Sequence, residues 1–333
     1  MNVKLVQFQN LQRLNITPKM HVDWVRESFL GKKDVLLPKK ISLTIRDDVF
    51  FNFMPSILPA IDTTGLKVVT RIPGRTPSLQ AQIFVYDEPS GDLSAIMDGT
   101  YITTMRTGAV ATLSTLELAV PDFYEVGMIG LGNCGRAYLN CLFDTIDNKK
   151  LLVKLYRYKL YADEVIKEYA NYQNITFRIV DTYEEIISGS DVIVSAVTYA
   201  DKLFCDDDSL YKKGCLLVPI HTRGFQNCDL FFDKVIVDDI SHICSFKNFD
   251  KFKNVYEISD VLDGTRLGRE SNEERIIAYD IGLSIHDLLF ARKYLDIIKE
   301  KKIDTETVCF DIPDKKIWVN INNTPHVKHR PHI

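Results

Sequence analysis

A glycine-rich turn in the middle of the chain has the residue types that bind a pyrophosphate. Gly130, Gly132 and Gly135 follow the apolar run YEVGMI and precede a stretch of helical character. Glycines in this order permit a tight turn, a close approach of the backbone to phosphates, and close packing of the helix on the strand. The N-terminus of the helix then faces the negative charge. We predict that this turn, which also contains Asn133 and Cys134, binds a dinucleotide.

The next predicted strand ends in basic residues. NAD-binding folds carry Asp or Glu about twenty residues after the glycines, where it accepts a hydrogen bond from the ribose 2′-hydroxyl. Here the run LLVKLY is followed by Arg157 and Lys159. A guanidinium and an ammonium group suit a 2′-phosphate. We therefore expect NADP(H) to be favoured, with NAD(H) as the alternative cofactor and plain surface charges as the alternative role of both residues.

Polar residues also follow two later strands. Thr198 comes after DVIVSAV, and His221 comes after GCLLVPI. Ligands of open α/β sheets bind outside the carboxyl ends of the strands, so we expect Thr198 to contact the cofactor. A histidine with a pKa near ~6.5 can act as an acid or a base, which makes His221 a candidate catalytic residue; a purely structural histidine is the alternative.

Hydrophobic periodicity and turn residues predict the elements that position these side chains. Before residue 120, one helix is signalled between Thr17-Pro18 and Gly31, and another over 101–119. Runs with the alternation typical of strands lie between these helices, at 41–46, 49–54, 66–72 and 80–87. We expect a mostly antiparallel sheet in this part of the chain.

After Pro121, apolar strands alternate with amphipathic helices, which favours a parallel, doubly wound sheet. A long helix is expected at roughly 280–299 and a hairpin over 307–321. The predicted fold class is α/β, with a Rossmann doubly wound parallel sheet and a second, mixed α+β domain. The expected domain limits are 1–119, 120–278, and a closing segment 279–333 that returns to the first domain.

The composition excludes several classes of protein. A length of 333 residues predicts about two domains. The 41 Lys and Arg against 45 Asp and Glu leave a net charge of −4, so we expect no nucleic-acid or membrane partner. No long apolar run is present, and seven cysteines without a C-x-x-C pair indicate reduced thiols. We expect a soluble, cytoplasmic protein.

Three histidines near the C-terminus have a spacing that could suggest metal binding: His326, His329 and His332. A disordered polar end is the more common meaning of such a pattern when no helix holds the side chains. We predict no metal site.

Two segments that flank the glycine turn resemble signatures of the ornithine cyclodeaminase/μ-crystallin family. One segment, residues 260–292, resembles the family signature in which a Gly and an Asp mark the start of a long closing helix. The other segment is residues 65–119, where the matching positions are Lys67, Pro73, Gly91, Met97-Asp98-Gly99, Thr103 and Arg106-Thr107. With the glycine turn, the resemblance covers about residues 35–300.

The resemblance implies a homodimer in which the first segment and the closing helix form a substrate-binding and dimerisation domain. Members of this family oxidise or reduce a C–N bond next to a carboxylate, as amino-acid dehydrogenases, ketimine reductases or cyclodeaminases do. We therefore expect an oxidoreductase that transfers a hydride to or from a nicotinamide and takes a small amino-acid-like substrate. The alternatives are ornithine cyclodeaminase itself and a non-catalytic, NADPH-dependent binding protein like μ-crystallin.

The resemblance also assigns roles to individual residues. Arg106 matches the family's substrate-binding Arg, whose planar guanidinium holds both oxygens of the α-carboxylate. Lys67 matches the active-site Lys, and desolvation in its apolar strand would lower its pKa and suit it to proton transfer or to carboxylate contact. Lys40 stands near a family Arg, Gln82 falls near a family substrate contact, and Gly282 is expected at the cofactor.

The chain departs from ornithine cyclodeaminases after the fifth strand of the parallel sheet. Their Gly-Gly-Asp-x-Pro-Gly-Lys loop, which contains a catalytic Asp, is replaced here by VPIHTRG over 218–224. His221 and Asp280 are the candidates to replace that Asp, and a helix N-cap is the alternative role of Asp280. Arg223 would contact an additional substrate carboxylate in the branch that oxidises N-(2-amino-2-carboxyethyl)-glutamate to make siderophore or antibiotic precursors.

Overall fold

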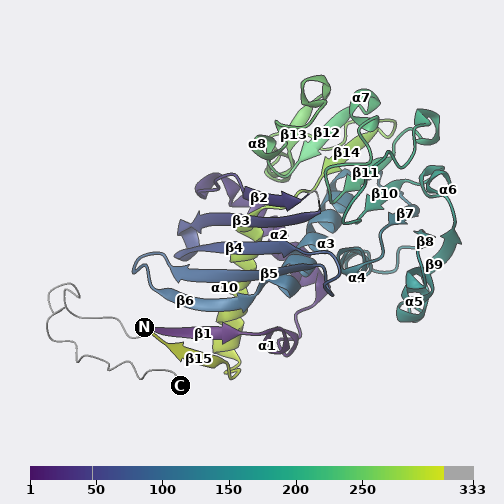
Figure 1. The fold of residues 1–333 in the computed structure, drawn as a ribbon. Coiled ribbons are helices and arrows are strands. Elements are labelled where there is room, and N and C mark those ends of the chain that lie inside the picture. The colour runs from purple at the N-terminus through teal and green to yellow at the C-terminus, as the bar shows by residue number, and fades with distance from the viewer. Residues whose placement is uncertain (47, 311–333) are drawn as a thin grey trace, which may run out of the picture.

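The computed structural model describes residues 1–46 and 48–310, which form two β-sheets with helices around them (Figure 1). The first sheet has seven strands in the order β15-β1-β6-β5-β4-β3-β2, and only the β1–β6 pair is parallel. Its strands are β1 (Asn2–Val6), β2 (Ile41–Arg46), β3 (Val49–Leu58), β4 (Thr63–Arg71), β5 (Leu79–Asp87), β6 (Leu93–Asp98) and β15 (Glu306–Cys309).

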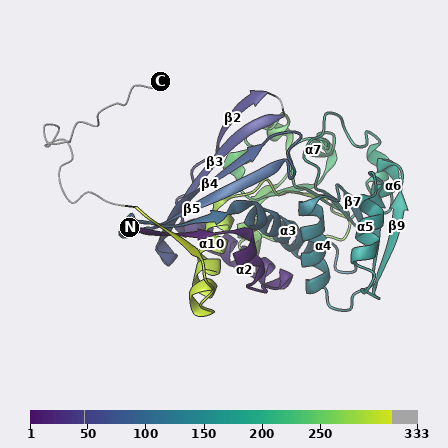
Figure 2. The same cartoon turned by 60° about the horizontal axis from the view of Figure 1, so that its bottom comes forward.

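Helices cover one face of the first sheet, and no helix of the described residues covers the other, which we call its open face (Figure 2). α3 (Gly99–Leu118) and α10 (Ser284–Glu300) contact the strands, and α2 (Pro18–Leu30) packs on both helices. Gly65 of β4 lies so close to α10 that an added Cβ would be 2.7 Å from Leu288 Cδ2. Because side chains alternate along a strand, Lys67 faces the same helix.

The second sheet has eight strands, all parallel, in the order β13-β12-β14-β11-β10-β7-β8-β9. The order reverses between β7 and β10, which is where ligands of doubly wound sheets bind. The strands are β7 (Glu125–Ile129), β8 (Leu151–Tyr156), β9 (Ile175–Val180), β10 (Val192–Ser195), β11 (Leu216–Pro219), β12 (Lys234–Val237), β13 (Val255–Glu257) and β14 (Ile276–Tyr279). This sheet and the mixed first sheet confirm the predicted fold class.

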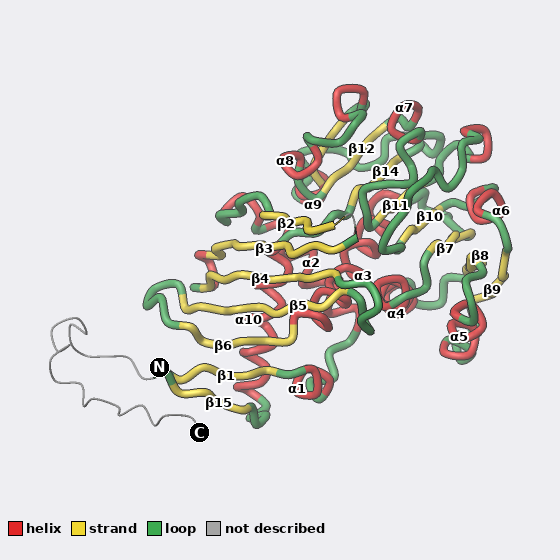
Figure 3. Tube along the Cα trace, in the orientation of Figure 1, coloured by secondary structure: helices red, strands yellow, loops and turns green. Residues whose placement is uncertain are grey.

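The remaining α-helices are mostly short; α1 lies at the end of β1 beside the first sheet, and the others lie around the second sheet, as Figure 3 shows in red. They are α1 (Phe8–Gln12), α4 (Asn133–Thr145), α5 (Tyr161–Glu168), α6 (Tyr183–Ile187), α7 (Cys228–Phe231), α8 (Ile240–Ile243) and α9 (Ile258–Leu262). Within the two described ranges, no helix is both long enough and apolar enough to span a membrane.

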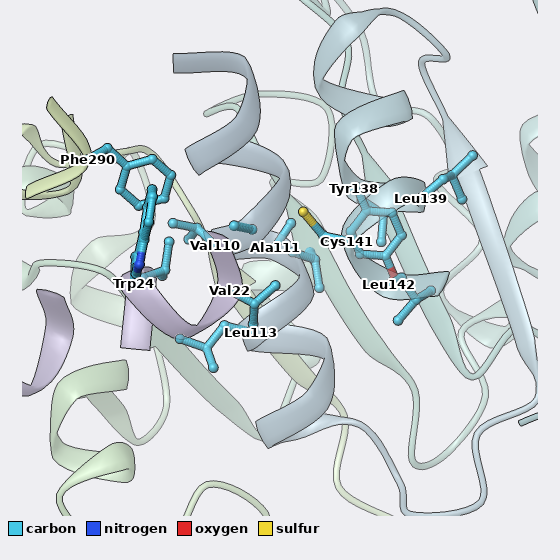
Figure 4. Packing of buried hydrophobic residues seen from close by; sticks show 14 of the residues in the cluster. Val22, Trp24, Val110, Ala111, Leu113, Tyr138, Leu139, Cys141, Leu142 and Phe290 are labelled. Atoms are coloured by element: carbon cyan, nitrogen blue, oxygen red, sulfur yellow. The ribbon is translucent and has the colours of Figure 1, made fainter. Parts of the chain in front are cut away.

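α3 and α4 join the two sheets through a shared hydrophobic core (Figure 4). Val110, Ala111 and Leu113 of α3 lie among buried side chains of α2 and α4. At Gly108 an added Cβ would be only 2.4 Å from the carbonyl carbon of Ala137, so glycine is required for this approach. We call the contact between these two helices the α3–α4 seam. It holds the start of α4, and therefore the glycine turn, against the helix that carries Arg106.

Several elements agree with the sequence-based predictions, and others were missed. α2 begins after Thr17, whose side chain accepts a hydrogen bond from Met20 N, and it ends at Gly31, as predicted. β1 and β6 were not predicted; they pair with each other in the sheet, and β6 also pairs with β5, which are contacts that sequence patterns do not show. β15 takes the first part of the predicted 307–321 hairpin, and it pairs with β1. The rest of that hairpin and the histidine-rich tail lie outside the described residues.

The chain crosses from the first sheet to the second along α3 and returns between β14 and α10. We keep 1–119, 120–278 and 279–333 as proposed domain limits, because the crossings fall near residues 119 and 279.

Candidate active site

Lys67, Arg106 and Asp287 form a buried group that we call the Asp287 triad. Lys67 Nζ lies 2.5 Å from Asp287 Oδ2, and Arg106 Nε lies 3.1 Å from Asp287 Oδ1. The three side chains come from β4, α3 and α10, and each is almost inaccessible to solvent. The fold thus brings together the two residues proposed to bind a carboxylate, through an aspartate that sequence analysis did not identify.

The position of Arg106 is fixed by the elements around it. Asp98 caps α3 by accepting a hydrogen bond of 2.7 Å from Tyr101 N, which explains the Asp in the Met97-Asp98-Gly99 motif. The guanidinium lies against Gly282, where an added Cβ would be 2.5 Å from Arg106 Nη1. Gly282 also has a φ of 88°, a conformation that favours glycine. Gly282 therefore provides the surface on which the Arg106 fork lies.

Burial and neighbouring charges perturb the lysines of the site. Desolvation and the nearby Arg106 guanidinium lower the pKa of Lys67 to about 7, against the opposing effect of Asp287. Lys40 lies within electrostatic range of Arg106 and Asp238. Burial lowers the pKa of Lys40, the charge of Asp238 opposes that change, and the charge of Arg106 lowers the pKa further. A lysine with a pKa near neutrality can exchange a proton or bind a carboxylate as a cation.

Asp280 lies near the Asp287 triad and is buried. Its Oδ1 accepts a hydrogen bond of 3.0 Å from Ser114 Oγ on α3. Burial raises its pKa well above the usual range, with Asp238 adding to the effect and Arg106 opposing it. The alternative role as a helix N-cap is wrong, because α10 begins at Ser284 and the residue before that start is Leu283.

The glycine turn has the geometry that its sequence predicts. An added Cβ on Gly135 would be 2.2 Å from Gly130 O, and one on Gly130, whose φ is 89°, would be 2.7 Å from the Ala196 carbonyl carbon. At Gly132, by contrast, no atom of the described chain lies within 4 Å of the added Cβ. Two glycines therefore serve close packing, and the third leaves open space beside the backbone.

The start of α4 fits a pyrophosphate. The helix begins at Asn133, and its N-cap is Gly132, which has no side chain to accept from the first N–H groups. The first N–H groups of a helix without a side-chain cap are free to donate to a ligand, so an anion can bind them. The residues present at this turn therefore fit a dinucleotide.

Cys134 of the glycine turn lies within electrostatic range of the Asp287 triad. Burial raises the pKa of its thiol, and the positive charges of Arg106 and Lys67 oppose that rise. Both cations are therefore within electrostatic range of the turn. The α3–α4 seam accounts for this proximity, because Arg106 lies two residues before Gly108.

His221 lies by the point where the strand order of the second sheet reverses. Its Nε2 is 2.6 Å from Ser195 Oγ at the end of β10, next to β7, and its ring packs near Phe204 and Phe225. Burial lowers the pKa of His221 to about 4, so the ring is neutral at pH 7. This pKa lies below the ordinary value of ~6.5 on which the expected acid–base role rests, because burial disfavours the charged ring. A neutral imidazole is a hydrogen-bonding group at this pH, not a strong acid.

The residues proposed for the ribose side of the cofactor are exposed. Arg157 follows β8, and its Nε lies 2.5 Å from Asp181 Oδ1, after β9. Lys159 has a φ of 51°, and Thr198 is exposed in the loop after β10. The end of β8 carries no carboxylate of its own, but Asp181 places one beside Arg157, which sequence spacing did not show.

Two predicted substrate contacts lie apart from the triad. Arg223 is exposed in the loop after β11. Gln82 is exposed on β5, and its neighbour Ile83 is the residue paired with Lys67. Gln82 therefore points to the open face of the first sheet, away from Lys67. The structure therefore places Gln82 away from the triad, whereas Arg223 follows His221 by two residues and makes no ion pair with the triad among the described residues.

Sequence analysis missed Asp287 and Asp238. A signal existed for each. Asp287 is the acidic residue in the mostly apolar run LSIHDLLFA, and Asp238 directly follows the buried strand VIV, at the carboxyl end of the sheet. An acidic residue within a buried stretch indicates a paired or functional charge.

The fold and the glycine turn together define a dinucleotide-binding protein with a second domain that holds buried, paired charges. The chain belongs to the ornithine cyclodeaminase/mu-crystallin family, whose sequence model matches residues 6–302. This confirms the resemblance seen in the sequence.

Named relatives indicate the range of activities in the family. The chain is 24% identical over 272 residues to a Delta(1)-pyrroline-2-carboxylate reductase of Bacillus cereus, which covers 73% of this chain and 79% of the relative. It is 23% identical over 229 residues to the N-((2S)-2-amino-2-carboxyethyl)-L-glutamate dehydrogenase of Staphylococcus aureus, covering 63% and 66%. The expected class of activity agrees with these names.

A solved structure shows the same fold. It is the Delta(1)-pyrroline-2-carboxylate reductase of Thermococcus litoralis in complex with NADH and L-proline. The TM-score is 0.82 at 24% identity, and the match covers 91% of this chain and all of that one.

Proposed function

We propose that this protein is an NAD(P)-dependent oxidoreductase that acts on a C–N bond next to a carboxylate, as an amino-acid dehydrogenase or imine reductase. The observation that carries the proposal is the Asp287 triad beside the glycine turn. A fixed pair of cations suits an α-carboxylate, and a dinucleotide at the turn supplies or accepts a hydride at the neighbouring carbon. The names of the relatives support the same class.

Arg106 and Lys67 bind the substrate carboxylate in this proposal. Arg106 uses Nε for Asp287, and its terminal nitrogens have no hydrogen-bond partner among the described residues. They are held against Gly282 and can bind both oxygens of a carboxylate. Lys67, paired to the other Asp287 oxygen, completes the positive site, and Lys40 adds a third cation nearby.

We propose NADP(H) as the preferred nicotinamide cofactor. Arg157 keeps its two terminal nitrogens free of partners within the described residues, while Asp181 holds Nε. A 2′-phosphate can bind those two nitrogens. Gly130, Gly132, Asn133, Cys134 and Gly135 would hold the pyrophosphate, and Lys159 and Thr198 would lie near the nucleoside.

The substrate would be a small amino-acid-like molecule. Arg223 is exposed beside the reversal point of the sheet, so it can meet a second carboxylate on a longer substrate. This supports the carboxyethyl-glutamate adduct as one candidate, and with it a role in making siderophore precursors. Cyclic imines with one carboxylate are the other candidates, since they need only Arg106 and Lys67.

We also propose a homodimer formed through the open face of the first sheet. Ile41, Leu43 and Ile45 of β2 are exposed although they are large and apolar. Phe53, which pairs with Ile41, shares this face. A Leu43→Glu variant should become monomeric by light scattering, whereas Thr44→Glu, one residue along the same strand, should stay dimeric. A wild-type monomer would refute this interface.

The function is tested by following NAD(P)H absorbance with purified protein, each cofactor, and a panel of cyclic imines, amino acids and the carboxyethyl-glutamate adduct. Turnover of one class, lost in Arg106→Ala, is the expected result. Ornithine conversion to proline without net change in cofactor would instead indicate a cyclodeaminase. Tight NADPH binding without any turnover would indicate a binding protein.

A further inference from the structure

Asp238 and Asp280 are buried side by side at the ends of neighbouring strands. β12 and β14 are parallel, and Val237 pairs with Tyr279 in the last position of the ladder. The next residue of each strand is the aspartate, so the two carboxyl groups emerge together at the carboxyl edge of the sheet. Both side chains are almost completely inaccessible to solvent.

In each aspartate, one carboxyl oxygen accepts a hydrogen bond, and the other has no hydrogen-bond partner within the described residues. Asp238 Oδ2 accepts a hydrogen bond of 2.5 Å from Gly282 N, and Asp280 Oδ1 accepts one of 3.0 Å from Ser114 Oγ. The other two oxygens, Asp238 Oδ1 and Asp280 Oδ2, are buried and have no hydrogen-bond partner within the described residues. Buried oxygens without partners are unfavourable, so a shared proton or a bound ligand is expected there.

Charged side chains from several neighbouring elements surround the two aspartates. Lys32, Lys40 and Arg106 are the cations in range, and Asp239 is the further anion. Burial raises the pKa of Asp238 to about 6 and that of Asp280 well above its usual range. Two carboxylates in one desolvated site cannot both ionise without strong repulsion, so the pair retains a proton near neutral pH.

We propose that Asp238 and Asp280 share one proton and together exchange it with the substrate nitrogen. This inference rests on the proposed function, and it adds Asp238 as a partner that makes Asp280 an effective acid. The Arg106 guanidinium connects the pair to the carboxylate site, because it lies against Gly282 and within electrostatic range of Asp280.

The step can be written for imine reduction. Asp280 would give its proton to the imine nitrogen, whose lone pair forms the N–H bond, and the resulting iminium carbon would accept a hydride from the reduced nicotinamide of the proposed cofactor. The electron pair of the C=N π bond then becomes the nitrogen lone pair. Asp280 is left as a carboxylate beside Arg106 and regains a proton from water. Amine oxidation runs through the same steps in reverse, with the unprotonated pair accepting the proton.

The other titratable groups of the site are less suited to this task. Lys67 is committed to Asp287 at 2.5 Å, and His221 is hydrogen-bonded to Ser195 at the reversal point of the sheet. The Asp238–Asp280 pair occupies a separate position, with free oxygens and without an ion-pair partner of its own within the described residues.

The first test compares pH profiles of kcat for the wild type, Asp280→Asn, Asp280→Glu and Asp238→Asn. Wild-type imine reduction should slow as pH rises through the upper pKa of the pair, because the acid form is lost. Asp280→Asn should lose on the order of 10²-fold or more in kcat together with that pH dependence. Asp238→Asn should shift the dependence, and Asp280→Glu should restore part of it.

Asp191→Asn is the matched control, because it removes a partly buried carboxylate at the opposite end of the same sheet. Its pH profile should match the wild type. An Asp280→Asn enzyme that keeps the wild-type pH dependence would overturn the proposal. Full loss of the pH dependence of kcat in the Asp191→Asn control would also overturn the proposal.

The second test needs no turnover. Carboxyl-carbon NMR of the protein without substrate should show two linked titration steps for Asp238 and Asp280, and the Asp238→Asn variant should collapse them to one. If Asp238 and Asp280 titrated independently, each with a pKa near its ordinary value, the proposal would be overturned. This result would hold even if a variant failed to fold. If the wild type turned over no imine or amine, the proposed function would be refuted. This titration would then still decide whether the two aspartates share a proton.

Discussion

Two Arg–Asp ion pairs in this molecule have similar chemistry and opposite surroundings. In the Asp287 triad, the side chains of Arg106 and Asp287 are 7% and 0% exposed. In the pair between Arg157 and Asp181, the exposures are 49% and 67%. Water and salt screen the exposed pair, whereas the buried one is screened little.

The difference teaches what each pair can do. A buried carboxylate between two cations fixes their positions, and its removal leaves charges that water cannot stabilise. The exposed pair holds one nitrogen of Arg157 and leaves the rest of the side chain available. We therefore expect the buried pair to determine folding and substrate geometry, and the exposed pair to adjust cofactor choice.

The largest expected effect comes from Asp287→Ala. The variant leaves Lys67 and Arg106 buried without a counter-charge, so the free energy of unfolding should fall by about 3–5 kcal/mol. Urea unfolding measures this change. Asp181→Ala is the matched exposed control, and an equal cost for both variants would contradict the comparison.

Arg106→Lys should have the next largest effect. The variant keeps the positive charge and loses the fork that binds two oxygens, so kcat/KM should fall by about 10²-fold, equivalent to ~2.7 kcal/mol. Cofactor affinity should not change. Steady-state kinetics and fluorescence titration with NADPH separate these quantities, and a loss confined to NADPH affinity would rule out the proposed carboxylate role.

Arg157→Ala tests the role of the exposed pair in cofactor choice. The affinity for NADPH should fall about tenfold, or ~1.4 kcal/mol, because the 2′-phosphate loses its guanidinium. NADH binding should stay the same. Arg178→Ala, an exposed charge on β9, is the control. Equal weakening of both cofactors by Arg157→Ala would remove the argument for NADP(H).

Asp181→Asn should have the smallest effect. Exposed pairs contribute about 0–1 kcal/mol, so the melting temperature should hardly change. The removal of a negative charge beside Arg157 should still tighten NADPH binding a few-fold. Calorimetric titration with NADPH and NADH checks this prediction, and weaker NADPH binding would show that Asp181 positions Arg157 for the phosphate.

The sequence predicted the fold class because periodicity and glycine spacing are local signals. Gly130, Gly132 and Gly135 could be placed from their neighbours alone, and the structure gives them the expected turn. The order of the strands and the open face of the first sheet could not be read in this way, because they depend on contacts between distant segments.

Only part of the site was predicted, because the contacts among its residues also join distant segments of the chain. Lys67 and Arg106 were identified through the resemblance to a family, yet nothing local showed that Asp287, far along the chain, joins them. The pKa of His221 was also beyond sequence reasoning, since it depends on the aromatic side chains that exclude water. Burial and partnership of charges are properties of the folded chain.

The α3–α4 seam has a consequence for how substrate range can change in this fold. Gly108 allows no side chain, so the distance between the dinucleotide turn and Arg106 is fixed by backbone against backbone. If Arg106 holds the substrate carboxylate as proposed, the carbon that bears this group has one permitted position relative to the hydride, whatever the rest of the substrate is. In this proposal, new specificities would arise away from the reacting end, for example in the exposed loop after β11 that carries Arg223, while the reacting end stays constant.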